Sequence, residues 1–185
     1  MKLEEIRDRK NLITFLEQKG KVRYLLFWGH KKTEKLTKSC LSQWWISPFT
    51  IDEVIYPSSE HFMMASKARL FKDEESLQKI LNAGSPAAAK KLGRQVKSFD
   101  DKIWREHRFQ IVVEASLAKF SQNEQLRDFL LETGNKVLVE ASPYDRIWGI
   151  GMSQHHEHCE NPQLWRGENL LGFALMEARE KIRDE

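Results

Sequence analysis

Residues 57–71 read PSSEHFMMASKARLF, and this stretch predicts a helix that carries two candidate reactive groups. A proline closes the preceding β-branched segment, and a serine follows where a helix N-cap belongs. Glu60 and Lys67 are seven residues apart, which brings them to nearly the same side of a helix that turns about 100° per residue. The residues between them on that side are methionines. Burying a carboxylate and an amine on an apolar stripe is costly unless they are paired or used, so we predict chemistry on this helix.

The two charged groups differ in their expected environments. Glu60 falls in the first helical turn, where the helix dipole favours a negative charge. Lys67 falls in the middle of the helix beside methionines and Phe71, where desolvation lowers the pKa of an amine and frees its neutral form. The structural alternative is an internal ion pair or a solvated edge of an amphipathic helix.

Composition limits the class of protein. The chain has 185 residues, of which 41% are hydrophobic and 31% charged, as expected for a domain that buries a proper core. Its apolar runs are too short to span a bilayer, and residues 1–5 carry early acids rather than a secretory signal, so we expect a cytoplasmic protein without a membrane partner. The net charge of +3 permits a phosphate-bearing ligand but does not require nucleic acid.

The sequence gives little support for disulfides or metals. Cys40 and Cys159 match neither a disulfide framework nor a paired-cysteine metal motif, so we expect two free thiols. Residues 155–159 read HHEHC, but adjacent side chains cannot all point at one ion without an unusual loop, and no second cluster has matching spacing. We therefore predict no metal site.

Periodicity and turn residues predict an α+β fold, a mainly helical single domain with a few short strands. We expect residues 1–20 to form an N-terminal helical extension and residues 21–185 to form the domain. The expected helices cover 2–18, 59–71, 74–81, 86–93, 101–120, 122–132 and 169–183, and the expected strands cover 22–28, 49–51, 54–56 and 136–140.

Three further segments carry candidate binding residues. Arg94 follows a glycine at a helix end and could clamp a phosphate, although a lone arginine is usually a surface residue. Glu140 ends a strand, Asp145 follows in a turn, and Trp148 precedes a Gly-x-Gly; carboxylates beside an aromatic plane suit a sugar or a base. The structural alternative for this segment is a tight turn with a packed tryptophan and no ligand. Asn169 is either the N-cap of the last helix or a ligand group at its N-terminus.

These segments occur in an order that resembles the NADAR family of N-glycosidases, also called YbiA-like. The matching residues are 58–61 (SSEH), Lys67, 91–94 (KLGR), Trp104, 138–140 (LVE), 145–151 (DRIWGIG), 165–172 (WRGENLLG) and 175–179 (LMEAR). The resemblance covers residues 24–183. It departs from the family pattern at Gln43 and Trp44, which replace a small polar pair and leave the shape of the substrate open, and at Ala65, where members often carry Gln.

The resemblance implies a mainly helical α+β fold that hydrolyses N-glycosidic bonds without a metal or other cofactor. It implies two substrate classes: phosphorylated, ribosylated pyrimidine intermediates of early riboflavin synthesis, and ADP-ribose attached to guanine bases, including guanine in nucleic acid. The sequence does not choose between these substrates, and it does not give the oligomeric state. The same residues could also serve a binding module that reads ADP-ribose or a nucleotide without chemistry.

Two routes of hydrolysis fit the residues. In one, a carboxylate activates water while another group acts as acid, with Glu60, Glu140 and Asp145 available. In the other, which the resemblance favours, Lys67 attacks the sugar carbon and forms an imine while Glu60 or Asp145 shuttles protons. The resemblance further implies substrate contacts from Arg94 to phosphate, Trp104 and Trp148 to the base or ribose, and Asn169 to sugar hydroxyls, together with Gly149 and His61.

Overall fold

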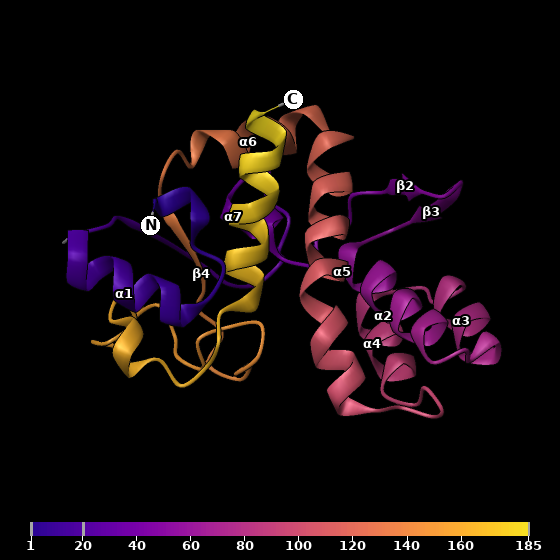
Figure 1. Ribbon diagram of the computed structural model, residues 1–185. Coiled ribbons are helices and arrows are strands. Elements are labelled where there is room, and N and C mark those ends of the chain that lie inside the picture. Colours follow the sequence, from indigo (N-terminus) through magenta and orange to yellow (C-terminus); the bar gives the residue numbers. More distant parts are fainter. Residues whose placement is uncertain (1, 20, 185) are drawn as a thin grey trace.

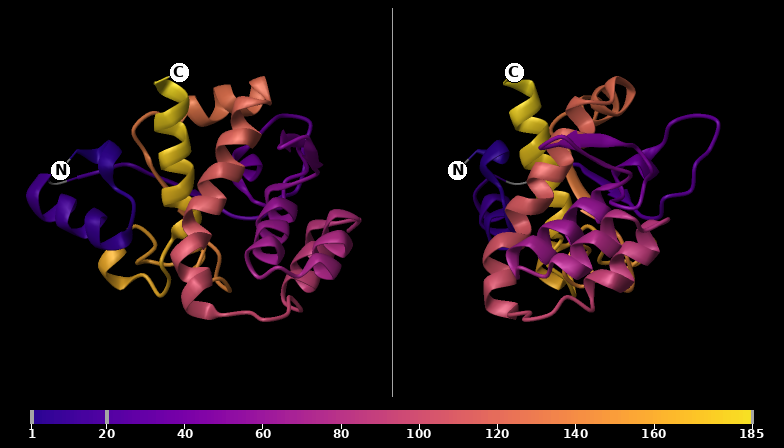
Figure 2. Two further views of the ribbon diagram at one scale, coloured as in Figure 1. Left: turned by 45° about the vertical axis from the view of Figure 1, so that its right-hand side comes forward. Right: turned by 90° about the vertical axis from the view of Figure 1, so that its right-hand side faces the viewer.

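Two helices, α5 (Asp101–Ser121) and α7 (Leu170–Arg183), pack against each other through the middle of the molecule (Figure 1). The computed structural model describes residues 2–19 and 21–184. Residue 20, where the expected N-terminal extension ends, therefore lies outside the described residues. Helices α2 to α4 gather on one side of the α5/α7 pair and α1 lies on the other (Figures 1 and 2).

The other elements confirm a mainly helical α+β domain. The remaining helices are α1 (Arg9–Lys19), α2 (Ser59–Leu70), α3 (Glu74–Leu81), α4 (Pro86–Gly93) and α6 (Glu124–Glu132), and the strands are β1 (Tyr24–Phe27), β2 (Phe49–Ile51), β3 (Val54–Tyr56) and β4 (Val137–Glu140). Short 3-10 helices cover Leu3–Glu5, Lys38–Leu41 and Pro162–Leu164. Among the residues that the structure describes, no helix has both the length and the apolar character needed to cross a membrane.

Local capping chemistry explains where the predicted helices begin. Ser58, rather than Ser59, caps α2, and its hydroxyl accepts a hydrogen bond from the backbone N–H of His61. Ser85 caps α4, and a proline occupies the first helical position, where its missing N–H costs no hydrogen bond. Asp100 caps α5 by accepting two backbone hydrogen bonds.

The strands form two separate pairs. β2 and β3, both predicted as strands, pair antiparallel in a hairpin. β1 and β4 pair in parallel, with Phe27 opposite Glu140, and the Ala141 N–H donates to the Phe27 carbonyl at 2.8 Å. The sequence predicted both strands but not their pairing. Because parallel strands end at the same edge, the residues that follow Phe27 and Glu140 come together in space.

The N-terminal segment packs on the domain. The predicted helix over residues 2–18 is in fact a 3-10 helix followed by α1, and the segment fully buries Ile6 and Leu12. Arg7 forms an ion pair with Glu177 at 3.0 Å, and Arg9 donates to two carbonyls of the Pro162–Leu164 helix. The domain boundary at residue 20 stays a prediction.

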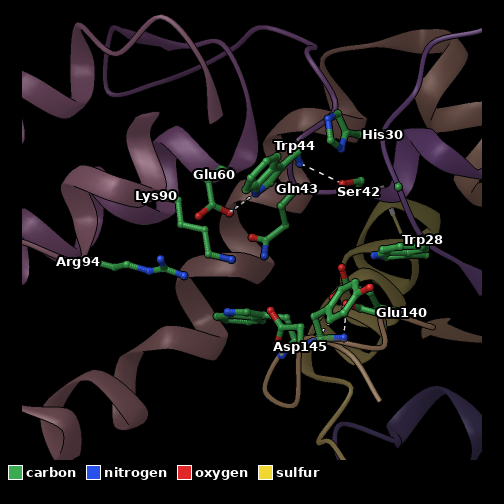
Figure 3. Close-up of a pocket in the computed structure, with 14 residues that line it drawn as sticks. Trp28, His30, Ser42, Gln43, Trp44, Glu60, Lys90, Arg94, Glu140 and Asp145 are labelled. Atoms are coloured by element: carbon green, nitrogen blue, oxygen red, sulfur yellow. Dashed lines mark hydrogen bonds between the residues drawn. The ribbon is translucent and has the colours of Figure 1, made fainter. Parts of the chain in front are cut away.

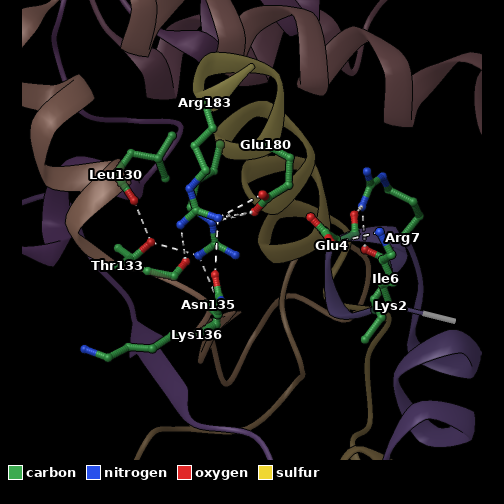
Figure 4. Close-up of polar contacts among 12 residues, drawn as sticks. Lys2, Glu4, Ile6, Arg7, Leu130, Thr133, Asn135, Lys136, Glu180 and Arg183 are labelled. Carbon is green, nitrogen blue, oxygen red and sulfur yellow. Dashed lines mark hydrogen bonds and ion pairs between the residues drawn. The ribbon is translucent and has the colours of Figure 1, made fainter. Parts of the chain in front are cut away.

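Buried arginine contacts hold the end of α7 against the turn before β4. Arg179 is almost fully buried and donates to the Thr133 hydroxyl at 2.8 Å and to the Lys136 carbonyl at 3.0 Å. One turn later Arg183 pairs with Glu180 (Figure 4). Because charged side chains are rarely buried without partners, these contacts fix the register of α7 relative to β4.

The close approach of α7 to β4 requires a glycine, which gives a first prediction. A Cβ added at Gly172 would overlap the Leu138 carbonyl oxygen and the Asn169 side-chain amide. We expect Gly172→Ala to lower the free energy of unfolding by about 1–3 kcal/mol, because backbone must shift to relieve the overlap. Urea unfolding measures the change.

Gly84→Ala is the matched control, because an added Cβ there meets no described atom within 4 Å. Equal stability of the Gly172→Ala and Gly84→Ala proteins would contradict the proposed tight contact.

Candidate active site

A cavity of about 430 Å³ opens at the carboxyl ends of β1 and β4 (Figure 3). Its lining residues are Trp28, Gly29, His30, Ser42, Gln43, Trp44, Glu60, Lys90, Arg94, Glu140, Ser142, Tyr144, Asp145 and Trp148. They come from the ends of both parallel strands, the segment before β2, the start of α2 and the end of α4. A volume of this size lies within the range of small-molecule sites.

Glu60 is buried in the wall of the cavity. It is 2% exposed, its backbone N–H donates to the Gln43 carbonyl at 3.1 Å, and its Oε2 accepts from the Trp44 indole N–H at 3.2 Å. Its Oε1 has no hydrogen-bond partner among the described residues. Burial raises the pKa of Glu60 to about 7, against an opposing effect of the Lys90 charge.

Glu140 is the second enclosed acid. As a residue it keeps some surface toward the cavity, but its Oε2 is buried and has no hydrogen-bond partner within the described chain. Burial, together with the neighbouring Asp145 carboxylate, raises the pKa of Glu140 to about 8, while Lys90 lowers it. Two carboxyl groups whose pKa values are raised to the neutral range therefore line one cavity.

Asp145 is held in a turn by its own neighbours. Its Oδ1 accepts hydrogen bonds from the backbone N–H groups of Ile147 at 2.8 Å and Trp148 at 2.7 Å. These bonds orient the carboxylate and also place the Trp148 indole, which is 9% exposed, against the cavity. The predicted combination of a carboxylate and an aromatic plane is present here.

Two basic side chains enter the cavity from the side opposite Trp28 (Figure 3). Lys90 lies in the last turn of α4, and its ammonium is 5.7 Å from the centre of the Trp44 ring. Arg94 follows α4 directly and is exposed. Both are available to an anionic ligand, since no carboxylate among the described residues lies within salt-bridge distance of either side chain.

The structure brings together half of the residues that the sequence singled out. Those that line the cavity are Glu60, Arg94, Glu140, Asp145 and Trp148. Those that do not line it are His61, Lys67, Trp104, Gly149 and Asn169.

The imine route requires Lys67 and Glu60 to reach one substrate, but only Glu60 lines the cavity. The Lys67 ammonium donates to the Gly93 carbonyl at 2.8 Å and lies 4.1 Å from the centre of the Phe99 ring. Seven residues also span about 10 Å along a helix axis, so two groups on one stripe need not reach the same space. Burial nevertheless lowers the pKa of Lys67, as the sequence predicted.

His61 and Trp104 have structural surroundings instead of cavity contacts. His61 is 1% exposed, its Nδ1 lies 2.8 Å from the Ser58 hydroxyl and its Nε2 lies 3.0 Å from the Ala83 carbonyl. Because a carbonyl oxygen only accepts hydrogen bonds, Nε2 carries the proton, and both ring nitrogens of His61 have a partner. Trp104 is buried with its ring centre 5.8 Å from the Lys67 ammonium.

Asn169 and Gly149 act on the backbone that carries the acids. The Asn169 side chain is fully buried, accepts from the Glu140 N–H at 2.9 Å and donates to the Leu138 carbonyl at 2.9 Å. It is the N-cap residue of α7, which is one of the two places predicted for it, but its side chain makes no cap bond and does not line the cavity. Gly149 lies so close to the Glu140 and Asp145 carbonyls that an added Cβ would crowd both.

Sequence reasoning missed several cavity residues. Lys90 had no signal, because it lies in an ordinary helix beside another lysine. Trp28 and Tyr144 had a weak signal, since Trp28 is the last residue of a predicted strand and Tyr144 follows soon after another. Gln43 and Trp44 were noticed only as departures from a family pattern, and the structure places both against Glu60.

Lys119 was missed altogether, although it positions the Gln43–Trp44 wall. It is fully buried in α5, and its ammonium donates to the carbonyls of Cys40 and Ser42 at 2.6 and 2.9 Å. Burial lowers the pKa of Lys119 to about 7. This amine therefore fixes the segment that contacts Glu60.

The histidine-rich segment after β4 lies apart from the cavity. His156 and His158 face each other with ring centres 5.5 Å apart, and Arg166 approaches His156. Across residues 2–19 and 21–184, no group of three or more His, Cys, Asp or Glu side chains has a geometry that could hold a metal ion.

Enclosed carboxyls, cationic side chains and indole planes in one cavity define a small-molecule site suited to acid–base chemistry. The NADAR domain family model matches residues 26–183, and the chain belongs to the NADAR family.

Relatives with known names support this assignment. The chain is 42% identical over 166 residues to N-glycosidase R617 of Acanthamoeba polyphaga mimivirus, covering 86% of this chain and 96% of that protein. It is 34% identical over 138 residues to N-glycosidase YbiA of Escherichia coli K12, covering 75% and 78% of the two chains. It is also similar to the NMR structure of E. coli YbiA, with a TM-score of 0.68, 26% identity and coverage of 100% and 94%.

The enclosure of Glu60 predicts a pH-dependent stability. Its pKa is about 7 in the folded protein and near 4.5 in the unfolded chain, so the folded state binds more protons between these values. The free energy of unfolding should therefore fall as the pH rises from 5 to 8, by about 2–3 kcal/mol relative to Glu60→Gln. Urea unfolding of both proteins across this range measures the difference.

The matched control is Glu124→Gln in the first turn of α6, where the side chain is exposed. Its stability should follow the unsubstituted protein at every pH. Parallel pH profiles for the unsubstituted and Glu60→Gln proteins would show that Glu60 is ionised in the folded state.

Proposed function

We propose that this protein hydrolyses the C–N bond between a phosphorylated ribose and a nitrogenous base. The candidate substrates are the phosphorylated ribosyl-pyrimidine intermediates of early riboflavin synthesis and ADP-ribose attached to guanine. The relatives named N-glycosidases support the reaction class, and the protein is a hydrolase acting on N-glycosyl bonds. The observation that carries the proposal is the pair of enclosed acids, Glu60 and Glu140, each with one buried oxygen that has no hydrogen-bond partner among the described residues, in the lining of a cavity that also holds Asp145.

The chemistry of this bond matches the charges in the cavity. Breaking it builds positive charge on the anomeric carbon and negative charge on the departing base. Glu140, with a pKa of about 8, is protonated at neutral pH and supplies a proton to the base as it leaves. The Asp145 carboxylate, oriented by two backbone N–H groups, stabilises the positive carbon.

The other lining residues suit the rest of such a substrate. Arg94 and Lys90 lie where a phosphate attached to the ribose can bind, and a guanidinium can hold phosphate oxygens through two parallel hydrogen bonds. The indole planes of Trp44 and Trp148 flank the space for a flat base. Binding energy on the phosphate then positions the ribosyl carbon against the acids.

Water or an amine completes the reaction. In the first route a water molecule attacks the anomeric carbon. In the second a lysine nitrogen bonds to that carbon, the base leaves with a proton from Glu140, the ribose ring opens to an imine, and water then hydrolyses the imine. Family resemblance assigns this amine to Lys67, which must then turn from the Gly93 carbonyl, whereas Lys90 already lies in the cavity.

A product assay tests the function. The purified protein is incubated separately with a phosphorylated ribosylaminopyrimidine and with an ADP-ribosylated guanine oligonucleotide, and chromatography follows free base and free sugar phosphate. Release of base from either substrate supports the proposal. Recovery of both substrates intact, with measurable binding, would instead indicate a nucleotide-binding module without chemistry.

Loss of the enclosed proton donor gives a further prediction. Glu140→Gln should lower kcat about 10²–10⁴-fold with little change in KM, because the amide fills the same space but cannot protonate the base. The activity of the unsubstituted protein should decline as the pH rises through about 8, where Glu140 loses its proton. Glu124→Gln serves as the control and should keep full activity.

Borohydride reduction during turnover separates the two routes. A covalent adduct located by mass spectrometry at Lys67 or Lys90 supports the imine route and identifies the amine. Lys67→Ala and Lys90→Ala variants complete the test, because the variant lacking the reacting amine forms no adduct. Turnover without any adduct in the unsubstituted protein rules out the imine.

A further inference from the structure

We infer that the mouth of the cavity carries a second ring-binding subsite, formed by Trp28 and Tyr144, for a nucleobase joined through phosphate to the ribosyl group inside. This inference rests on the proposed function, which places a phosphorylated ribose in the cavity. It adds a part of the ligand that the cavity itself does not enclose. The two aromatic residues take no part in the acid–base chemistry described above.

The two rings meet at the edge where the parallel strands end. Trp28 directly follows β1, and Tyr144 lies four residues beyond the end of β4. Their ring centres are 6.1 Å apart and the ring planes are tilted by 57°. Both residues line the cavity, and Figure 3 shows Trp28 on the side away from Lys90 and Arg94. The pairing of β1 with β4 thus brings two aromatic residues from distant parts of the chain to one rim.

Neither ring is buried in the hydrophobic core. Trp28 is 52% exposed and Tyr144 is 85% exposed, whereas Trp104, Trp148 and Trp165 are buried. A tryptophan is usually largely buried, and exposed aromatic planes beside a cavity are typical of sites where bases stack. The adjoining rings therefore present apolar surface to solvent beside the cavity.

The size of the cavity supports a ligand that extends beyond it. Its volume of about 430 Å³ lies in the lower part of the range for small-molecule sites. The Glu60, Glu140 and Asp145 carboxyls are available to the scissile bond, and Arg94 and Lys90 to a phosphate. A nucleobase joined to the ribosyl group through a diphosphate would extend the ligand across the cavity, from Arg94 and Lys90 to the rim formed by Trp28 and Tyr144.

A basic segment directly follows Trp28 in the sequence. Residues 29–38 contain four lysines and one glutamate, which is a local excess equal to the net charge of the whole protein. Lys31, Lys32 and Lys35 are exposed, and Lys38 ties the end of this segment to the β1 carbonyl of Leu26 at 2.6 Å. The segment therefore stays beside the rim and offers cations to a phosphate backbone that leaves the cavity.

Two ligands share this chemistry of base, phosphate and ribose. One is a small dinucleotide-like molecule, and the other is a nucleic acid strand. The ring subsite is common to both, and only a strand would continue along the lysines of residues 29–38. Competition between the two kinds of ligand therefore identifies the source.

Calorimetric titration of the full chain tests the subsite with ribose 5-phosphate and ADP-ribose, whose integrity is checked by chromatography. ADP-ribose should bind at least about tenfold more tightly, because one base stacks on the rim. Trp28→Ala and Tyr144→Ala should reduce this ratio to near one while leaving the affinity for ribose 5-phosphate unchanged. Trp28→Phe and Tyr144→Phe should preserve the ratio, since they keep an aromatic plane.

The matched control is Ile55→Ala, which removes a side chain that is 68% exposed and does not line the cavity. It should leave both affinities unchanged. Circular dichroism confirms that each variant is folded. Equal affinity for the two ligands, or an unchanged ratio in both alanine variants, overturns the inference.

Hexathymidylate identifies the source of the ligand. Displacement of ADP-ribose by this strand, weakened by added salt and by the double substitution Lys31→Gln and Lys35→Gln, supports a nucleic acid strand. Absence of displacement, with tight ADP-ribose binding, supports the small molecule. The binding data need no turnover: a ratio that depends on Trp28 without any base release leaves the subsite standing and refutes the hydrolase, whereas base release with an unchanged ratio refutes the subsite alone.

Discussion

The buried amide of Asn169 ties the last helix to the end of a strand, and the geometry of the cavity depends on that contact. The amide accepts from the Glu140 N–H and donates to the Leu138 carbonyl. The left-handed backbone of Asn169, with φ of 56°, lets α7 begin at once, and Gly172 lets it pass against β4. Glu140 therefore leaves the strand at a fixed point and angle, with its carboxyl group in the cavity.

A second polar side chain sets the opposite wall. Lys119, buried in α5, holds the Cys40 and Ser42 carbonyls, and the next residues along the chain contact Glu60 through the Gln43 carbonyl and the Trp44 indole. Two groups outside the cavity thus position the two acids inside it. Such supporting contacts matter because an acid must be held within a fraction of an ångström of the bond it protonates.

Short stretches of sequence predict most of the helices and strands. No feature of the sequence predicts which distant segments pair. Ser85 with its following proline defines the start of α4 within three residues, and the hairpin of β2 and β3 closes within eight. The parallel pairing of β1 with β4 depends on packing between segments more than a hundred residues apart, which no periodicity encodes. Local sequence marks Glu140 and Asp145 as candidates, whereas the place of Trp28 and Lys90 in the same cavity follows only from the folded chain.

The cavity combines features that oppose stability and favour proton delivery. Three carboxyl groups share it, and an ionised carboxylate buried beside another is unfavourable unless it is neutralised. Burial raises the pKa of both Glu60 and Glu140 to the neutral range, so the folded protein holds protons there that the unfolded chain releases. A solvated carboxyl has already lost its proton at neutral pH and cannot give it to a departing base. Enclosure at the end of β4 thus weakens the fold and, in the proposed reaction, supplies the acid for the same physical reason.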